Sequence, residues 1–196
     1  MKFKQLVAAA ALACGALVAA PASAVVVTGF TGALGTTVDD YSGTGLVSFD
    51  LGMASARPAT KITFAVESGD VGGLLDFNAV IANLFGGGIN VFALSLANAT
   101  FATIGTVNDV FGGSTPSASG NGNFAAIHFG VPNTFEFEIG DPRGYGGTNW
   151  AIDIAGLSAG DTFTLSLDVP EPGSLPLMLA GLLGLGAVLR RRAPKA

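Results

Sequence analysis

Between residues 25 and 169, short apolar stretches alternate with clusters of Gly, Asn, Ser and Pro. In residues 161–169 every second residue is apolar, namely Phe163, Leu165, Leu167 and Val169. Residues 61–66 and 149–154 show the same two-residue period. Because successive side chains of a β-strand point to opposite faces, this period predicts strands with one buried face.

The remaining apolar runs predict further strands, and no stretch before residue 170 has the period of an amphipathic helix. The expected strands cover residues 25–27, 46–50, 61–66, 75–84, 89–96, 100–107, 124–131, 134–139, 149–154 and 161–169. Residues 156–160 predict a hairpin-like turn, and the Gly/Ser/Asn-rich residues 108–123 an exposed loop. About eight to ten short strands predict an all-β fold. The favoured architecture is an antiparallel, jelly-roll-like β-sandwich spanning residues 25–169, and a barrel is the alternative.

Residues 1–24 have the organisation of a secretory signal peptide. A lysine-containing start precedes an apolar stretch at residues 6–20, and small residues place the cleavage site between Ala24 and Val25. The alternative use of this segment is lipid attachment at Cys14, the single cysteine. The expected partners are the Sec translocon and signal peptidase, and the mature chain is expected to contain no cysteine for a disulfide.

Three segments follow one another in residues 170–196. The tripeptide Pro170-Glu171-Pro172 predicts a stiff linker, because proline fixes φ and lacks an N–H. The uncharged residues 174–189 predict a transmembrane helix, which is short but workable when flanking arginines reach the headgroups. The basic end, residues 190–196, should stay cytoplasmic, so the preceding chain lies outside. Its consecutive arginines are Arg190, Arg191 and Arg192. A permanent single-pass anchor is the simpler alternative.

This tail resembles the PEP-CTERM sorting signal of Gram-negative bacteria. The resemblance rests on Val-Pro-Glu-Pro-Gly-Ser at residues 169–174, the Leu/Gly/Ala-rich stretch and the Arg-rich end, about a seventh of the chain. It implies that Pro170, Glu171 and Pro172 are recognised by exosortase, a membrane cysteine peptidase that cuts near this motif. It also implies transient residence in the inner membrane, delivery to the cell surface or extracellular matrix, and an association with exopolysaccharide.

Most of the positive charge of the chain lies in its two ends. The whole chain has a net charge of −5, but residues 25–169 contain three basic residues and 13 acidic ones, a net charge of −10. Such a body repels nucleic acid and anionic lipid, which argues against a nucleic-acid partner. A solvated acidic exterior is the plainest interpretation.

Carboxylates in Gly-rich turns are the best candidates for a metal site. Asp39, Asp40, Asp70 and Asp76 offer hard oxygen ligands of the kind that calcium prefers. No stretch has the spacing of a known calcium loop, so calcium is an alternative and no cofactor is assigned.

Catalytic chemistry finds little support. Glu136 and Glu138 lie two residues apart, which puts both on one face of a strand at a spacing near that of paired glycosidase carboxylates. Phe135, Phe137 and Ile139 are expected to face the core. The simpler interpretation is therefore that the two glutamates lie on the solvent-exposed face of the strand. His128, the only histidine, lacks a second histidine or a nucleophile motif nearby in the sequence.

Residues 141–150 gather aromatic and polar residues in one Gly-rich loop. Tyr145 and Trp150 offer faces on which a sugar ring can stack, although Trp150 also begins an alternating run and so fits the core. The sequence therefore favours a non-enzymatic, exported surface or matrix protein associated with exopolysaccharide or biofilm. The alternatives are a carbohydrate- or calcium-binding adhesive module and, less favoured, an exported hydrolase.

Overall fold

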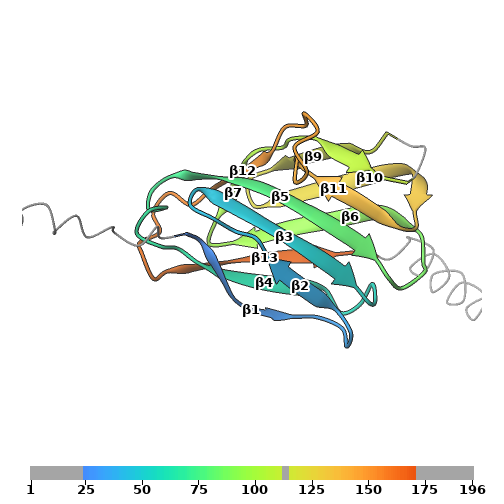
Figure 1. Ribbon diagram of the computed structural model, residues 1–196, viewed down its shortest axis with the longest axis horizontal. Helices are drawn as coiled ribbons and strands as arrows, with labels where there is room; N and C mark the ends of the chain where they lie inside the picture. The colour runs from blue at the N-terminus through green and yellow to red at the C-terminus, as the bar shows by residue number, and fades with distance from the viewer. Residues whose placement is uncertain (1–23, 112–114, 171–196) are drawn as a thin grey trace, which may run out of the picture.

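The computed structural model describes residues 24–111 and 115–170 and is built from two facing β-sheets (Figure 1). The first sheet has six strands in the order β1-β4-β13-β6-β10-β9. Its strands are β1 (Val26–Thr31), β4 (Thr60–Ala65), β6 (Ile89–Ala97), β9 (Ser117–Asn121), β10 (Phe124–Asn133) and β13 (Thr162–Asp168). All neighbours in this sheet are antiparallel.

The second sheet has seven strands in the order β2-β3-β5-β11-β8, with β12 paired to β5 and β7. Its strands are β2 (Thr37–Asp40), β3 (Leu46–Met53), β5 (Leu74–Asn83), β7 (Thr100–Thr103), β8 (Val107–Asp109), β11 (Glu136–Ile139) and β12 (Trp150–Asp153). Strands β3 and β5 run parallel, so the sheet is mixed. The predicted all-β sandwich is confirmed, whereas its uniformly antiparallel pairing is wrong for this one pair.

Aromatic rings fill the space between the sheets. Phe49 on β3 lies 6.2 Å from Phe64 on β4, and Phe92 on β6 lies 5.1 Å from Phe137 on β11, measured between ring centroids. All four side chains are fully buried. Burial of a phenylalanine side chain contributes about 1.5–3 kcal/mol, so these contacts hold the two sheets face to face.

The predicted turn at residues 156–160 does not form a hairpin. Strand β12 pairs with β5 and β7 in one sheet, whereas β13 pairs with β4 and β6 in the other. The connection therefore crosses from sheet to sheet. Both strands alternate as expected, but the alternation identifies only a buried face and not the sheet to which it belongs.

Two strands lie where none was expected. Strand β2 follows the Gly/Thr-rich segment, and β9 lies inside the predicted loop at residues 108–123. Both are edge strands of small and polar residues, so they lack the apolar run by which a strand is recognised in a sequence. The expected strand at residues 100–107 is also divided into β7 and the start of β8.

The two ends of the sandwich differ in which connections they carry. Strand β13 runs antiparallel to β6 and ends at the edge of the sandwich where β6 begins (Figure 1). Five connections share this end, which we call the tail-exit end. They are residues 32–36, 54–59, 84–88, 134–135 and the β8–β9 connection, of which residues 110–111 and 115–116 are described. The opposite end, called the far end, carries residues 41–45, 66–73, 98–99, 122–123 and 154–161.

Asparagines brace the tail-exit end. Asn83 Nδ2 donates to the carbonyls of Gly87, at 2.6 Å, and Asn133, at 3.3 Å. Asn133 Nδ2 in turn donates to Asp109 Oδ1 and to the carbonyl of Glu136. These bonds satisfy buried backbone groups and fix the connections at this end.

Candidate functional site

An arginine lies over the outer face of the second sheet. Arg143, in the loop between β11 and β12, donates from Nη2 to Glu136 Oε1 at 2.8 Å and from Nη1 to Glu138 Oε1. The pKa of the guanidinium is raised, first by its hydrogen bond to Glu136. Glu138 is only 3% exposed, so the expectation that it faces water is wrong. The expectation that Phe135 faces the core is also wrong, because β11 starts after it and leaves its ring 64% exposed.

A groove of about 520 Å³ lies beside this cluster. Its walls are Thr106, Asn108, Val110, Glu138, Arg143, Tyr145, Gly146 and Gly147. The Tyr145 ring is 80% exposed, while its backbone N–H donates to Asp141 Oδ1 at 2.7 Å. The groove therefore combines an exposed aromatic face with charged hydrogen-bonding groups on a loop held by Asp141.

Trp150, the other aromatic candidate for a glycan contact, does not reach this groove. Its side chain is fully buried, and its indole Nε1 donates to the carbonyl of Thr106 at 3.0 Å. The structure thus separates Tyr145 at the surface from Trp150 in the core. The alternation with Ile152 and Ile154 already favoured the core position.

The calcium candidates are dispersed. Asp39 and Asp40 lie on β2, where both oxygens of Asp40 accept backbone N–H groups, those of Val27 and Ser42. Asp70 lies in a far-end turn and accepts the N–H of Gly45, while Asp76 is exposed on β5. Nowhere in residues 24–111 and 115–170 do three or more His, Cys, Asp or Glu side chains gather as a metal site would require. Calcium binding at these residues stays an untested expectation.

His128 is exposed on β10, opposite Val91 of β6 and Ser117 of β9. Neither neighbour supplies a carboxylate that would orient the imidazole. The histidine is therefore placed as an ordinary strand residue at the surface.

Asp50, on β3 of the second sheet, has a shifted pKa. Burial raises the pKa of Asp50, and the charges of Asp39 and Glu136 add to the rise, whereas Arg143 opposes it. Asp50 faces Asp39 across the β2–β3 ladder. A row of carboxylates thus crosses this face, with one arginine among them.

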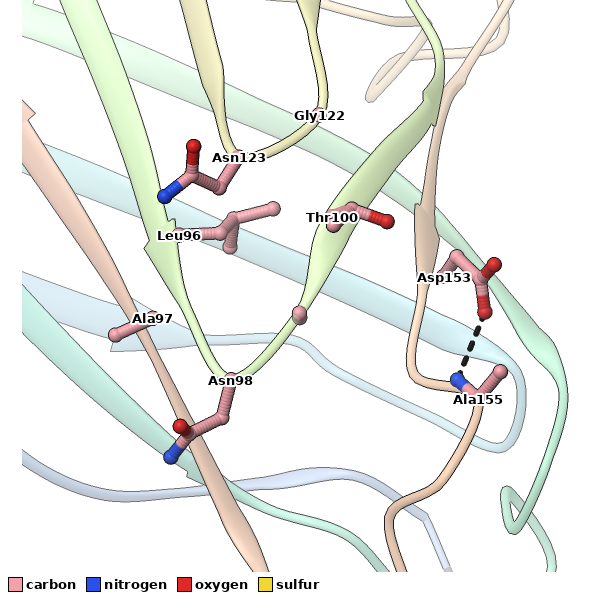
Figure 2. Close-up of a pocket in the computed structure, with 9 residues that line it drawn as sticks. Leu96, Ala97, Asn98, Thr100, Gly122, Asn123, Asp153 and Ala155 are labelled. Atoms are coloured by element: carbon pink, nitrogen blue, oxygen red, sulfur yellow. Dashed lines mark hydrogen bonds between the residues drawn. The ribbon is translucent and has the colours of Figure 1, made fainter.

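A second hollow lies at the far end, between the β6–β7 turn, the β9–β10 turn and the end of β12 (Figure 2). Asn98, Thr100 and Asn123 line it, and Asp153 Oδ1 accepts the N–H of Ala155 at 2.7 Å. Asn98 has a positive φ of 65°, a conformation that asparagine adopts more readily than most other residues with a side chain. The hollow is open, and the drawn side chains do not converge on a common point (Figure 2).

The chain leaves the sandwich at the tail-exit end. Strand β13 lies in the middle of its sheet, between β4 and β6, and its last residue is Asp168. Val169 packs partly against the core, and the exposed Pro170 follows. One residue therefore separates the folded strand from the first proline of the Pro-Glu-Pro tripeptide.

Comparison with known protein families decides what this tripeptide belongs to. Residues 168–192 match the model of the PEP-CTERM protein-sorting motif. The tail is a PEP-CTERM sorting motif. Neither the curated proteins nor the solved structures contain a match to this chain.

The PEP-CTERM motif implies exosortase as a processing partner and an exported protein that is held transiently at the membrane. Its first three residues belong to the described structure and overlap the end of β13. Of the predicted signal cleavage site, Ala24 is half-buried and Val25 is buried, and nothing tests the cleavage itself. Residues 1–23, Glu171 and Pro172 of the tripeptide, the predicted helix and Arg190 to Arg192 lie outside the described residues. Within the part that is described, no helix has the length and apolar character needed to cross a membrane.

Proposed function

We propose that this chain is a non-enzymatic protein of the cell surface or extracellular matrix that reaches its destination through exosortase. The PEP-CTERM motif at residues 168–192, which starts on the last residue of the sandwich, carries this proposal. In it, the signal peptide is removed after Ala24, the tail inserts into the inner membrane, and cleavage near residues 170–172 releases the sandwich. The released domain, a jelly-roll-like sandwich, then joins a layer rich in exopolysaccharide.

Intact-mass analysis of the exported protein tests this route. The wild-type strain should yield a chain that has lost the residues after the PEP tripeptide, whereas a strain without exosortase should yield one that ends at Ala196. A wild-type product that retains residues 190–196 would show that the tail is a permanent anchor.

The groove beside Tyr145 favours a second candidate function, binding of carbohydrate. An exposed aromatic face next to Arg143 and Asn108 offers stacking for a sugar ring and donors for its hydroxyl groups. Replacing Tyr145 by Ala should weaken binding of extracted exopolysaccharide roughly tenfold, corresponding to about 1.4 kcal/mol of lost contact free energy. Affinity electrophoresis measures the change, and Tyr41→Ala, an exposed tyrosine on the far end, is the matched control. Equal migration of both variants and the parent would exclude this groove.

A further inference from the structure

The tail-exit end presents large apolar side chains to solvent. Leu84 is 62% exposed, Phe111 70% and Phe135 64%, and Leu34 and Val131 are exposed at the same end. The rings of Phe111 and Phe135 lie 6.4 Å apart in an edge-to-face arrangement. Exposed apolar side chains that gather at one place mark a surface for contact with a membrane or another protein.

The two ends of the sandwich both expose apolar residues, but they differ in the number of acidic residues in their connections. The five connections of the tail-exit end contain no Asp or Glu, and their one charged residue is Arg57. The far-end connections contain Glu67, Asp70 and Asp161. The far end also exposes apolar residues, among them Val71 and Leu74, but it does so among carboxylates.

The carboxylates nearest to the tail-exit end stand on strand ends. Asp109 accepts a hydrogen bond from the neutral side-chain amide of Asn133, and the charge of Glu136 is offset by its ion pair with Arg143. Asp168 is the third and ends β13. A body with a net charge of −10 is repelled by anionic lipid, and the tail-exit end is the part of it that approaches with the least repulsion.

The tail brings this end close to the bilayer. Four residues, 171–174, separate Pro170 from the apolar run that starts at Leu175, and four extended residues span at most about 14 Å. Because this linker is so short, the tail-exit end has a high effective concentration at the lipid surface, and this does not depend on a protein partner.

We propose that, while the tail is in the membrane, the tail-exit end rests on the lipid headgroups through Leu34, Leu84, Phe111, Val131 and Phe135. The contact holds the sandwich upright over the bilayer and keeps the PEP tripeptide at headgroup level. Aromatic and apolar side chains at such a depth bury their surface among the headgroups. The inference rests on the proposed membrane-held intermediate.

Site-specific fluorescence in vesicles tests the contact with a matched pair of positions. Leu84 and Leu74 are both 62% exposed, but Leu74 is the first residue of β5 and Leu84 directly follows its last residue at the opposite end. Leu84→Cys and Leu74→Cys, each in the chain from Val25 to Ala196, which contains no other cysteine, are labelled with an environment-sensitive fluorophore. The vesicles contain phosphatidylethanolamine, phosphatidylglycerol and a minor fraction of lipid with a nitroxide on its headgroup. Protection of residues 190–196 from added trypsin reports insertion of the tail.

With the tail inserted, the label at position 84 should lose fluorescence at least about twofold to the headgroup nitroxide, and the label at position 74 should change little. If the tail is protected from trypsin and the nitroxide lipid reduces the fluorescence equally at both positions, the headgroup contact is overturned and the sorting route stays intact. A label at position 84 that is shielded from dissolved iodide but not quenched by the lipid would mean that protein, such as a second copy, covers this end. A tail that trypsin digests completely would refute the membrane-held intermediate and this contact together.

Discussion

The side chain of Arg143 comes from a Gly-rich loop and reaches two carboxylates on a strand that precedes it in the chain. Glu138 is buried beneath it, so the guanidinium replaces the water that this carboxylate would otherwise bind. A buried carboxylate without a partner costs far more than an exposed ion pair contributes. The main role of Arg143 is therefore to make the burial of Glu138 tolerable.

Replacing Arg143 by Ala should lower the free energy of unfolding by about 1–3 kcal/mol, because Glu138 is left buried without a donor. Urea unfolding of the exported chain measures the loss, with the exposed Lys61→Ala as control. In a Glu138→Gln background the same arginine change should cost less, since no charge is stranded. Equal costs in both backgrounds would show that Arg143 acts through packing alone.

Replacing Asp50 by Asn should stabilise the protein at neutral pH. Burial raises the pKa of Asp50 above its ordinary value of 3.8, so the folded state prefers the protonated carboxyl. The free energy of unfolding that this preference contributes is fully present at pH values below the ordinary pKa of 3.8. It is lost as the pH rises through the raised pKa of the folded state. The neutral amide avoids that loss, and its advantage should shrink as the pH falls towards 3.8.

Thermal unfolding at neutral and acidic pH checks this. The matched control is Asp76→Asn on neighbouring β5, whose carboxylate is exposed to water. A pH-independent advantage for Asp50→Asn would exclude ionisation as its cause.

At this scale the sequence identifies core residues better than surface roles. Alternation alone predicts that Trp150 and Phe163 are buried, and both are fully buried. The burial of Glu138 cannot be predicted, because it depends on an arginine delivered by another segment. The exposed Phe111 and Phe135 have one sequence signal, namely that they are apolar residues in connections without Asp or Glu.

Among the elements, the segment between β7 and β8 depends on a glycine. A Cβ at Gly105 would collide with the backbone carbonyls of Thr148 and Asn149, which cannot move without breaking the bond from Thr106 N–H to Thr148 O. Gly105→Ala should therefore cost about 1–3 kcal/mol, as overpacking does. Gly29→Ala in β1 has open space around its Cβ and is the control, so equal melting temperatures of the two variants would contradict this account.

Strand positions follow from the sequence more readily than strand partners do. The alternation of residues 161–169 locates β13, but its neighbours β4 and β6 are set by contacts with segments about 70 to 100 residues away. For the same reason, the sequence does not show that the chain passes from the second sheet to the first between β12 and β13. The parallel pairing of β3 and β5 has no local signal either. Strand β4, which connects them in the sequence, lies in the first sheet, so nothing near either strand indicates that the two are neighbours.

At the scale of the whole molecule, the sandwich is complete before the Pro-Glu-Pro tripeptide begins. A chain that ends at Pro170 retains all strands of the described structure, so its melting temperature should match that of the full chain. A chain that ends at Gly160 lacks β13 and its buried Phe163, Leu165 and Leu167, and should fail to fold. Circular dichroism during heating distinguishes the two, and a stable shorter chain would show that β13 is dispensable.

The central position of β13 also has a consequence for the order of events in time. Strands β4 and β6 each pair with β13 and not with one another, so the first sheet stays divided until residues 162–168 arrive. In a chain that is exported from its N-terminus, these are the last residues of the sandwich to emerge. On the proposed route, the domain therefore completes its folding only as the tail reaches the membrane. Until residues 162–168 have crossed, the first sheet cannot close; once they have crossed, the finished domain stands directly before the Pro-Glu-Pro tripeptide.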